Sequence, residues 1–192
     1  MTGSMIIALT GTPGTGKTTV CEFIKEHSKY REKYRIIDLH KLILDEKLHT
    51  GRDEDRDTYI ADMERLRERV AELIKQTPVG MDTIIESHIS HYLPADVIIV
   101  LRAEPVALRK RLGKRREYSY EKVKENSDAE ALDVILVEST EASDRVFEIN
   151  TTDMNLVSVV KSIDDIIESL KDGKILEEYL PGKINWIDQV EL

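Results

Sequence analysis

A glycine-rich segment near the N-terminus constrains the fold of this chain more than any other feature. Residues 11–18 read Gly-Thr-Pro-Gly-Thr-Gly-Lys-Thr, the pattern of glycine, four residues, glycine, lysine and a hydroxyl residue that forms phosphate-binding loops. The apolar run Met5 to Leu9 precedes it, and Val20, Phe23 and Ile24 follow it at helical spacing. We therefore expect a buried strand, a tight loop and a helix that packs back on the strand.

The residue types in this loop suit a polyphosphate. Such a densely anionic ligand needs main-chain N–H groups turned inward, and Gly14 and Gly16 permit the torsions that this requires. The helix that begins near Lys17 directs the positive end of its dipole at the phosphates. Lys17 can reach the β and γ oxygens, the Thr18 hydroxyl can bind Mg²⁺, and Thr19 can approach the α-phosphate. The candidate ATP-binding residues are therefore Gly14, Thr15, Gly16, Lys17, Thr18 and Thr19.

Four further apolar or β-branched segments predict strands that join the first one. They lie at 35–38, 83–86, 97–101 and 145–149. Helices are expected at 17–26, 39–48, 57–75, 120–138 and 156–170, with another that starts near Pro105. Strands that alternate with helices predict an α/β fold of the P-loop NTPase class, with a five-stranded parallel sheet and helices on both of its faces.

Composition excludes several classes of protein. The 192 residues suit a single domain, and 41 % apolar with 34 % charged residues can form a core under a charged surface. The net charge of −9 argues against a direct nucleic-acid site, because nonspecific affinity for phosphate backbones comes from clustered Lys and Arg. The apolar runs are too short to span a membrane.

The single cysteine and the two chain ends give further expectations. Cys21 cannot form an internal disulfide, so a reducing, cytoplasmic location fits best, and a small buried side chain is its expected role. Residues 1–4 are expected to form a flexible leader. Residues 173–192, which contain Trp186, are expected to lie over the surface as a tail.

The rest of the sequence narrows the class of phosphate-loop protein. A GTPase would carry the guanine-reading element Asn-Lys-x-Asp, which does not occur in this chain. A large mechanochemical ATPase would need more residues, whereas 192 residues suit a small-molecule phosphotransferase. Such an enzyme needs a cationic subsite for the acceptor and a mobile cover that excludes water, because ATP is otherwise hydrolysed.

Five further motifs follow the loop in a characteristic order. They are Asp-Leu-His-Lys at 38–41, Asp-Glu-Asp-Arg-Asp at 53–57 with Asp62, Glu-Ser-His at 86–88, Arg-Glu-Tyr at 116–118 and Ala-Glu-Ala-Leu-Asp-Val at 129–134. From Met5 to about Thr152 this order resembles the archaeal and nuclear-type adenylate kinases. That family is the sixth adenylate kinase isoenzyme group, also known as small-subunit ribosome assembly ATPases.

The resemblance implies a domain organisation and an activity. It implies one nucleoside monophosphate kinase domain over residues 1–192, with a short segment for the monophosphate at about 38–76 and a short lid at about 114–126. It also implies reversible phosphoryl transfer between ATP and AMP with broad nucleotide tolerance, and weak ATP hydrolysis. The partner it implies is a basic small-subunit ribosomal protein, bound during late maturation of the small ribosomal subunit.

The resemblance also gives roles to residues outside the loop. Lys41, where the family often has arginine, would attract the AMP phosphate as a point charge. Glu86, where the family usually has aspartate, would hold Mg²⁺ partly through water or orient a nucleophile. His88 would position water or the acceptor phosphate. Arg116 would fold over the γ-phosphoryl group, with Arg115 as a rival because one residue is inserted upstream.

Several alternatives stay open at this stage. Histidines 88 and 91 form His-x-x-His, but a zinc site would need a third ligand. Lys41 and the arginines near 116 could also be solvated surface cations. For the whole chain, one alternative is an assembly ATPase whose AMP kinase activity is incidental, and another is a kinase that acts on a small metabolite.

Overall fold

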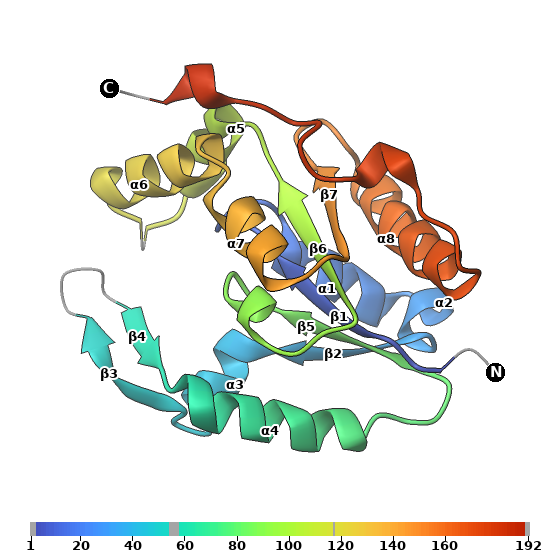
Figure 1. Cartoon of the computed structure of the whole chain (residues 1–192). Coiled ribbons are helices and arrows are strands. Elements are labelled where there is room, and N and C mark those ends of the chain that lie inside the picture. The colour runs from blue at the N-terminus through green and yellow to red at the C-terminus, as the bar shows by residue number, and fades with distance from the viewer. Residues whose placement is uncertain (1–2, 54–57, 117, 191–192) are drawn as a thin grey trace.

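Five parallel strands form the central sheet of this protein. The computed structural model describes residues 3–53, 58–116 and 118–190 (Figure 1). The strand order is β2-β5-β1-β6-β7. The bounds are Ile6–Thr10 for β1, Tyr34–Asp38 for β2, Asp82–Glu86 for β5, Val97–Arg102 for β6 and Val146–Asn150 for β7. The predicted five-stranded parallel sheet of the P-loop NTPase class is confirmed.

Helices cover both faces of this sheet, also as predicted (Figure 1). On one face lie α1 and α8, at Lys17–Glu26 and Leu156–Lys171, with the short α2 at Ser28–Arg31. On the other lie α3, α4 and α7, at Leu39–Asp45, Met63–Lys75 and Val134–Ala142. Helices α5 and α6, at Pro105–Leu112 and Tyr120–Ala131, pack on each other. None of the helices in the described residues is long and apolar enough to cross a membrane.

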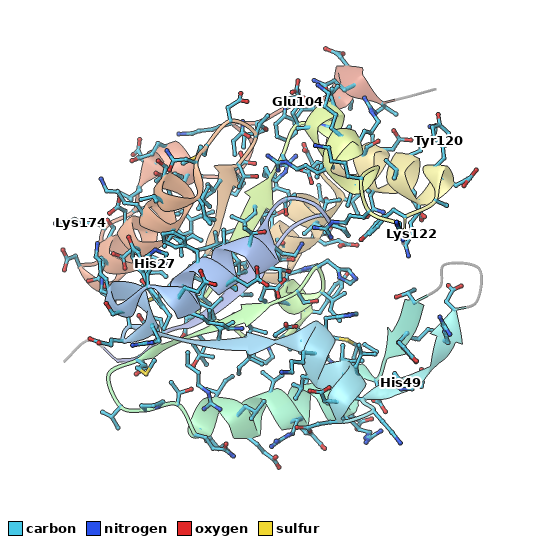
Figure 2. The ribbon with its side chains drawn as sticks, turned by 180° about the vertical axis from the view of Figure 1, so that it is seen from behind. His27, His49, Glu104, Tyr120, Lys122 and Lys174 are labelled. Carbon is cyan, nitrogen blue, oxygen red and sulfur yellow. The ribbon has the colours of Figure 1, made fainter. Side chains whose placement is uncertain are left out.

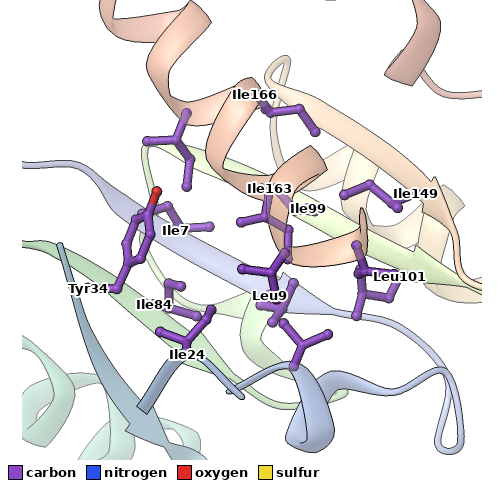
Figure 3. Packing of buried hydrophobic residues seen from close by; sticks show 14 of the residues in the cluster. Ile7, Leu9, Ile24, Tyr34, Ile84, Ile99, Leu101, Ile149, Ile163 and Ile166 are labelled. Atoms are coloured by element: carbon purple, nitrogen blue, oxygen red, sulfur yellow. The ribbon is translucent and has the colours of Figure 1, made fainter. Parts of the chain in front are cut away.

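The central strand β1 is buried on both sides, which explains its unbroken apolar sequence. Ile7 and Leu9 pack in the cluster that α1 and α8 cover, whereas Ala8 packs in the cluster that includes Leu136 of α7. Figure 3 shows Ile163 of α8 close to Ile7 and Leu9. Each fully buried side chain of this size stabilises the fold by about 1.5–3 kcal/mol. This packing fixes the carboxyl end of β1, where the phosphate-binding loop begins.

The prediction of a helix at 57–75 is wrong for residues 58–61, which form a strand. The structure has a hairpin there: β3 at His49–Asp53 pairs antiparallel with β4 at Thr58–Ala61. Helix α4 begins only at Met63, because the Asp62 carboxylate accepts a hydrogen bond from the main-chain N–H of Arg65 and caps the helix. Residue 57 and most of the motif at 53–57 lie outside the described residues.

The helix expected at 120–138 is two helices. Helix α6 ends at Ala131 and α7 begins at Val134, because Asp133 adopts a left-handed conformation with φ 56°. This conformation interrupts the helical hydrogen bonds and lets the Asp133 carboxylate accept a hydrogen bond from Arg102. The break between α6 and α7 is therefore also the place where Asp133 forms an ion pair with Arg102 of β6.

The C-terminal segment contains two short helical turns, η2 at Glu177–Tyr179 and η3 at Ile187–Gln189. The Tyr179 hydroxyl donates a hydrogen bond of 2.9 Å to Ser162 of α8. Figure 1 shows the segment running from α8 across the top of the sheet to α5. Of the N-terminal leader expected at 1–4, residues 1 and 2 lie outside the described part of the chain.

Candidate active site

The loop between β1 and α1 has glycines with positive φ at three positions, 11, 14 and 16. Gly11 has φ 134°, and a Cβ atom there would lie 2.2 Å from the carbonyl oxygen of Leu101. Gly16 has φ 104° and precedes the first helical residue, Lys17. Side chains at these positions would be strained, so the glycines allow the chain to turn sharply from the sheet edge into the helix.

The N-terminus of α1 is open toward this loop. Within the described residues no side chain caps this helix end, and its first turn contains no acidic residue. The first N–H groups of a helix have no partner within the helix, and the helix dipole places partial positive charge there. The amides of Lys17, Thr18 and Thr19 therefore provide the geometry that binds a phosphate.

The Lys17 ammonium lies inside the loop. Its Nζ donates hydrogen bonds of 2.6 Å to the carbonyl oxygen of Gly11 and 3.1 Å to that of Thr12. Burial lowers the pKa of Lys17 to about 8, against the opposing charges of Glu86 and Glu130. Lys17 is therefore mostly protonated at neutral pH and can meet an anionic ligand.

Glu86 reaches the same place from the neighbouring strand. It ends β5 and lies beside Leu9 of β1 in the parallel register. The Thr18 hydroxyl donates a 3.3 Å hydrogen bond to its carboxylate. Burial raises the pKa of Glu86, and the charge of Lys17 opposes this rise. A hydroxyl and a carboxylate side by side are oxygen ligands that fit Mg²⁺, which keeps several waters and binds to few protein groups.

The two histidines after β5 have different surroundings. His88 has solvent access, but the protein atoms around its ring displace water and, with the charge of Lys17, lower the pKa of His88 to about 4. His91 is buried, with Nδ1 3.0 Å from the Thr10 hydroxyl and Nε2 3.2 Å from Glu138. Across residues 3–53, 58–116 and 118–190, no group of three or more His, Cys, Asp and Glu side chains could hold a metal ion.

The cations predicted for the acceptor and the lid lie at the surface. Lys41 is exposed in the first turn of α3, where its main-chain N–H donates to Asp38. Arg115 and Arg116 are exposed in the turn after α5. Burial is the main cause that lowers the pKa of Lys17, and the charge of Arg115 adds only the smallest of the contributions. The structure therefore brings Lys17, Thr18 and Glu86 together, whereas Lys41 and Arg116 lie outside this group.

Sequence reasoning missed Arg111, which supports the loop from α5. Its guanidinium donates to the carbonyl oxygens of Gly14 at 3.3 Å, and of Thr151 and Thr152 at 3.1 Å each. The Thr151 hydroxyl in turn donates to the carbonyl oxygen of Thr15 at 2.8 Å. The loop after β7 is thus tied to the phosphate-binding loop. Nothing in the basic run of α5 distinguishes Arg111 from its neighbours.

Two structural segments that the sequence assigns to the acceptor and the lid project from the rest of the fold (Figure 1). The β3–β4 hairpin and helix α6 project on the same side of the molecule, as both whole-chain views show (Figure 1; Figure 2). Figure 2 labels His49 on the hairpin, and Tyr120 and Lys122 on α6. The hairpin belongs to the segment at 38–76, and the start of α6 belongs to the segment at 114–126.

Comparison with known proteins places this site in a family. A family model described as "AAA domain" matches residues 7–133. A protein of Methanosarcina acetivorans named "Putative adenylate kinase" is 48 % identical, over 97 % of this chain and 100 % of its own length. Proteins of the same name from Methanosarcina barkeri and Archaeoglobus fulgidus are 47 % and 41 % identical, over 97 % of this chain and 100 % and 94 % of theirs. The chain belongs to the family of these archaeal putative adenylate kinases.

The archaeal family resemblance inferred from the motifs is thereby confirmed, whereas membership of the sixth isoenzyme group stays a prediction. Among solved structures, a shikimate kinase from Bacteroides thetaiotaomicron matches with a TM-score of 0.53 over 85 % of this chain and 98 % of its own. Its sequence is 18 % identical. At that identity the match shows the shared fold alone.

Proposed function

We propose that this protein is a nucleoside monophosphate kinase that transfers the γ-phosphoryl group of ATP to AMP, giving two ADP. The observation that carries the proposal is the position of the Lys17 ammonium, which lies in a glycine loop beside the paired oxygens of Thr18 and Glu86. The choice of AMP as first acceptor is supported by the family, whose archaeal members are named "Putative adenylate kinase".

The loop residues would hold the triphosphate. The main-chain amides at the start of α1 would bind phosphate oxygens, and Lys17 would exchange the carbonyls of Gly11 and Thr12 for the β and γ oxygens. Charge on the moving phosphoryl group spreads over its oxygens in the transition state, so a fixed ammonium there lowers the barrier. The residues assigned to ATP are Gly14, Thr15, Gly16, Lys17, Thr18 and Thr19.

Thr18 and Glu86 would hold Mg²⁺, Glu86 partly through water. When bound, the ion would neutralise charge on the β- and γ-phosphates. In the chain itself, the buried Glu86 carboxylate keeps the Thr18 hydroxyl turned toward the loop. No covalent intermediate is required, because the transfer depends on positioning and electrostatics.

The acceptor and the lid would come from the two projecting segments. Residues 38–76 would bind AMP, with Lys41 attracting its phosphate. Residues 114–126 would close over the γ-phosphoryl group with Arg116, or with Arg115, whose charge is already felt at Lys17. His88, neutral at pH 7, would position the acceptor phosphate by hydrogen bonding without an added charge.

The experiment is to measure ADP formation from ATP and Mg²⁺ by the full chain, with and without AMP. The proposal predicts a strong stimulation by AMP, and Lys17→Ala should abolish turnover without unfolding the protein. The matched control is Lys161→Ala, which removes an exposed lysine of α8 and should leave the rate unchanged. ATP hydrolysis that ignores AMP would contradict the proposal and favour an assembly ATPase.

A second set of acceptors tests the substrate class. In the same assay, AMP is replaced in turn by CMP, UMP, GMP and sugar acids. AMP should give the highest kcat/KM. A sugar acid that exceeds AMP would assign the protein to small-metabolite kinases. ATP hydrolysis and a role in small ribosomal subunit maturation, which the family resemblance implies, stay predictions.

A further inference from the structure

A buried ion network lies behind the phosphate-binding loop, and the proposed function does not use it. Its centre is Arg102, the last residue of β6, which is 1 % exposed. The guanidinium donates at 2.7 Å to Glu130 and at 3.0 Å to Glu148, and it also donates to Asp133. Three carboxylates thus surround one cation, and Glu130 and Glu148 are themselves buried.

Glu130 extends this network to the loop. One of its carboxylate oxygens accepts hydrogen bonds from Arg102 and from the main-chain N–H of Ala103, and the other accepts from the Thr12 hydroxyl. The carbonyl of Thr12 receives both Lys17 Nζ and the main-chain N–H of Thr15. Thr12 is therefore in contact with both the turn at Thr15 and the Lys17 ammonium, two parts of the loop that would bind the nucleotide.

The C-terminal segment completes the network at its other end. The Trp186 ring lies over the Arg102 guanidinium, with its centroid 5.2 Å from Cζ. The second oxygen of Glu148 accepts from the main-chain N–H groups of Lys183, at 2.8 Å, and Ile184, at 3.2 Å. Farther on, Gln189 of η3 donates to Glu104 at 3.1 Å. Figure 2 labels Glu104 beside this turn.

The charges explain why these contacts depend on each other. A buried ion pair is stable only when its remaining polar atoms are satisfied, and breaking one partner leaves an uncompensated charge. Here the C-terminal amides satisfy Glu148, and the Trp186 ring covers Arg102 and interacts with its charge. Arg102 in turn orients Glu130, which fixes Thr12.

We infer that Glu130 and Arg102 are positioning residues for the phosphate-binding loop, and that Trp186 stabilises this arrangement from the C-terminal segment. The inference rests on the proposed function for its ligand, a nucleoside triphosphate. Movement at Thr12 is transmitted to Trp186 through Glu130 and Arg102, and loss of the Trp186 ring weakens nucleotide binding.

The chain offers its own reporter, because Trp186 is its single tryptophan. We would titrate the full chain with a nonhydrolysable ATP analogue and Mg²⁺, recording tryptophan emission and, separately, heat of binding. Emission should change along the same binding curve as the heat. In Thr12→Val, which keeps the shape but removes the hydroxyl, binding should weaken about tenfold and the emission change should disappear.

A second pair of variants tests the end of the network at Trp186. Trp186→Leu should raise the KM for ATP severalfold with kcat nearly unchanged, and Trp186→Phe, which keeps an aromatic face, should restore the wild-type KM. The control is Ile175→Ala in the same C-terminal segment, at a side chain that is 62 % exposed, and it should leave KM unchanged. Thermal melting shows that each variant is folded.

The results separate this inference from the proposed function. An emission change that persists in Thr12→Val, or a Trp186→Leu variant with the wild-type KM, would overturn the inference. If the wild-type chain binds the analogue but AMP does not stimulate ADP formation, the kinase proposal fails. The coupling between Thr12 and Trp186 is then still decided by the binding and emission curves.

Discussion

The Thr18 hydroxyl lies 3.3 Å from a Glu86 carboxylate oxygen, although the two residues are 68 positions apart in the chain. Their meeting follows from the sheet. Strands β1 and β5 are parallel neighbours, so Glu86 at the end of β5 lies beside the point where the chain leaves β1 for the loop and helix α1. The pair is therefore fixed by sheet register and helix entry together.

Loss of the Glu86 charge is expected to slow phosphoryl transfer. We expect Glu86→Gln to lower kcat about 100-fold, because an electrostatic group next to the transferred phosphoryl typically contributes this much. In the same assay, a higher Mg²⁺ concentration should be needed to reach half of the maximal rate. Glu22→Gln, at an exposed position of α1, should behave like the wild type. An equal loss of kcat in Glu86→Gln and Glu22→Gln would mean that the rate depends on the net charge of the protein and not on the position of Glu86.

The activity should fall as the pH rises through about 8. The pKa of Lys17 is lowered to about 8 by burial, and only its protonated form can replace the loop carbonyls with phosphate oxygens. A profile of kcat/KM for ATP reports this group in the free enzyme. Lys17→Arg, which keeps its charge at all these pH values, should be slower but should lack the alkaline limb.

The lowered pKa of Lys17 also predicts how stability depends on pH. Stability should rise with pH where the activity falls. Between pH 8 and 10.5 the unfolded chain keeps the Lys17 proton while the folded chain releases it, so the unfolded state binds more protons and stability rises with pH. The free energy of unfolding, measured in urea without nucleotide, should therefore increase over this range relative to Lys17→Met. A difference between the two proteins that stays constant from pH 8 to 10.5 would contradict the lowered pKa.

A side chain at Gly11 should damage both the fold and the site. In Gly11→Ala the new Cβ would meet the Leu101 carbonyl oxygen at 2.2 Å with φ at 134°, so the backbone must shift. We expect a loss of about 2 kcal/mol or more in the free energy of unfolding, together with loss of nucleotide binding. Gly51→Ala in β3 is the control, because nothing lies within 4 Å of its added Cβ atom.

Comparing two adjacent arginines will identify the lid residue. The family motif gives the lid role to Arg116, so we expect Arg116→Ala to lower kcat more than Arg115→Ala. Raising the salt concentration should reduce the difference, because both side chains are exposed and their charges are screened. A larger loss in Arg115→Ala would assign the lid role to Arg115 instead.

The sequence predicted the parts of the fold that local patterns encode. The loop at 11–18, its preceding strand and its following helix were correct, because glycines, a lysine and a helical apolar period all lie within 20 residues. The hairpin at 49–61 was missed because Ile60 continues the spacing of Met63 and Leu66, which reads as one more helical turn.

The network around Arg102 could not be predicted from local patterns. Its partners Glu130 and Glu148 lie 28 and 46 residues away, and neither stands at a position that periodicity marks as buried. In the sequence, Arg102 simply ends an apolar strand. Only the sheet topology brings the ends of β6 and β7 and the helix α6 together around it.

The contact between Trp186 and Arg102 has a consequence for how this chain is made. Synthesis proceeds from the N-terminus, so residues 11–18 leave the ribosome well before the residue that covers Arg102, Trp186. The first strand, loop and helix can fold early, but the support behind Thr12 is incomplete until position 186 has emerged. A chain that stopped before position 186 would thus lack support in a part of the molecule that was translated much earlier.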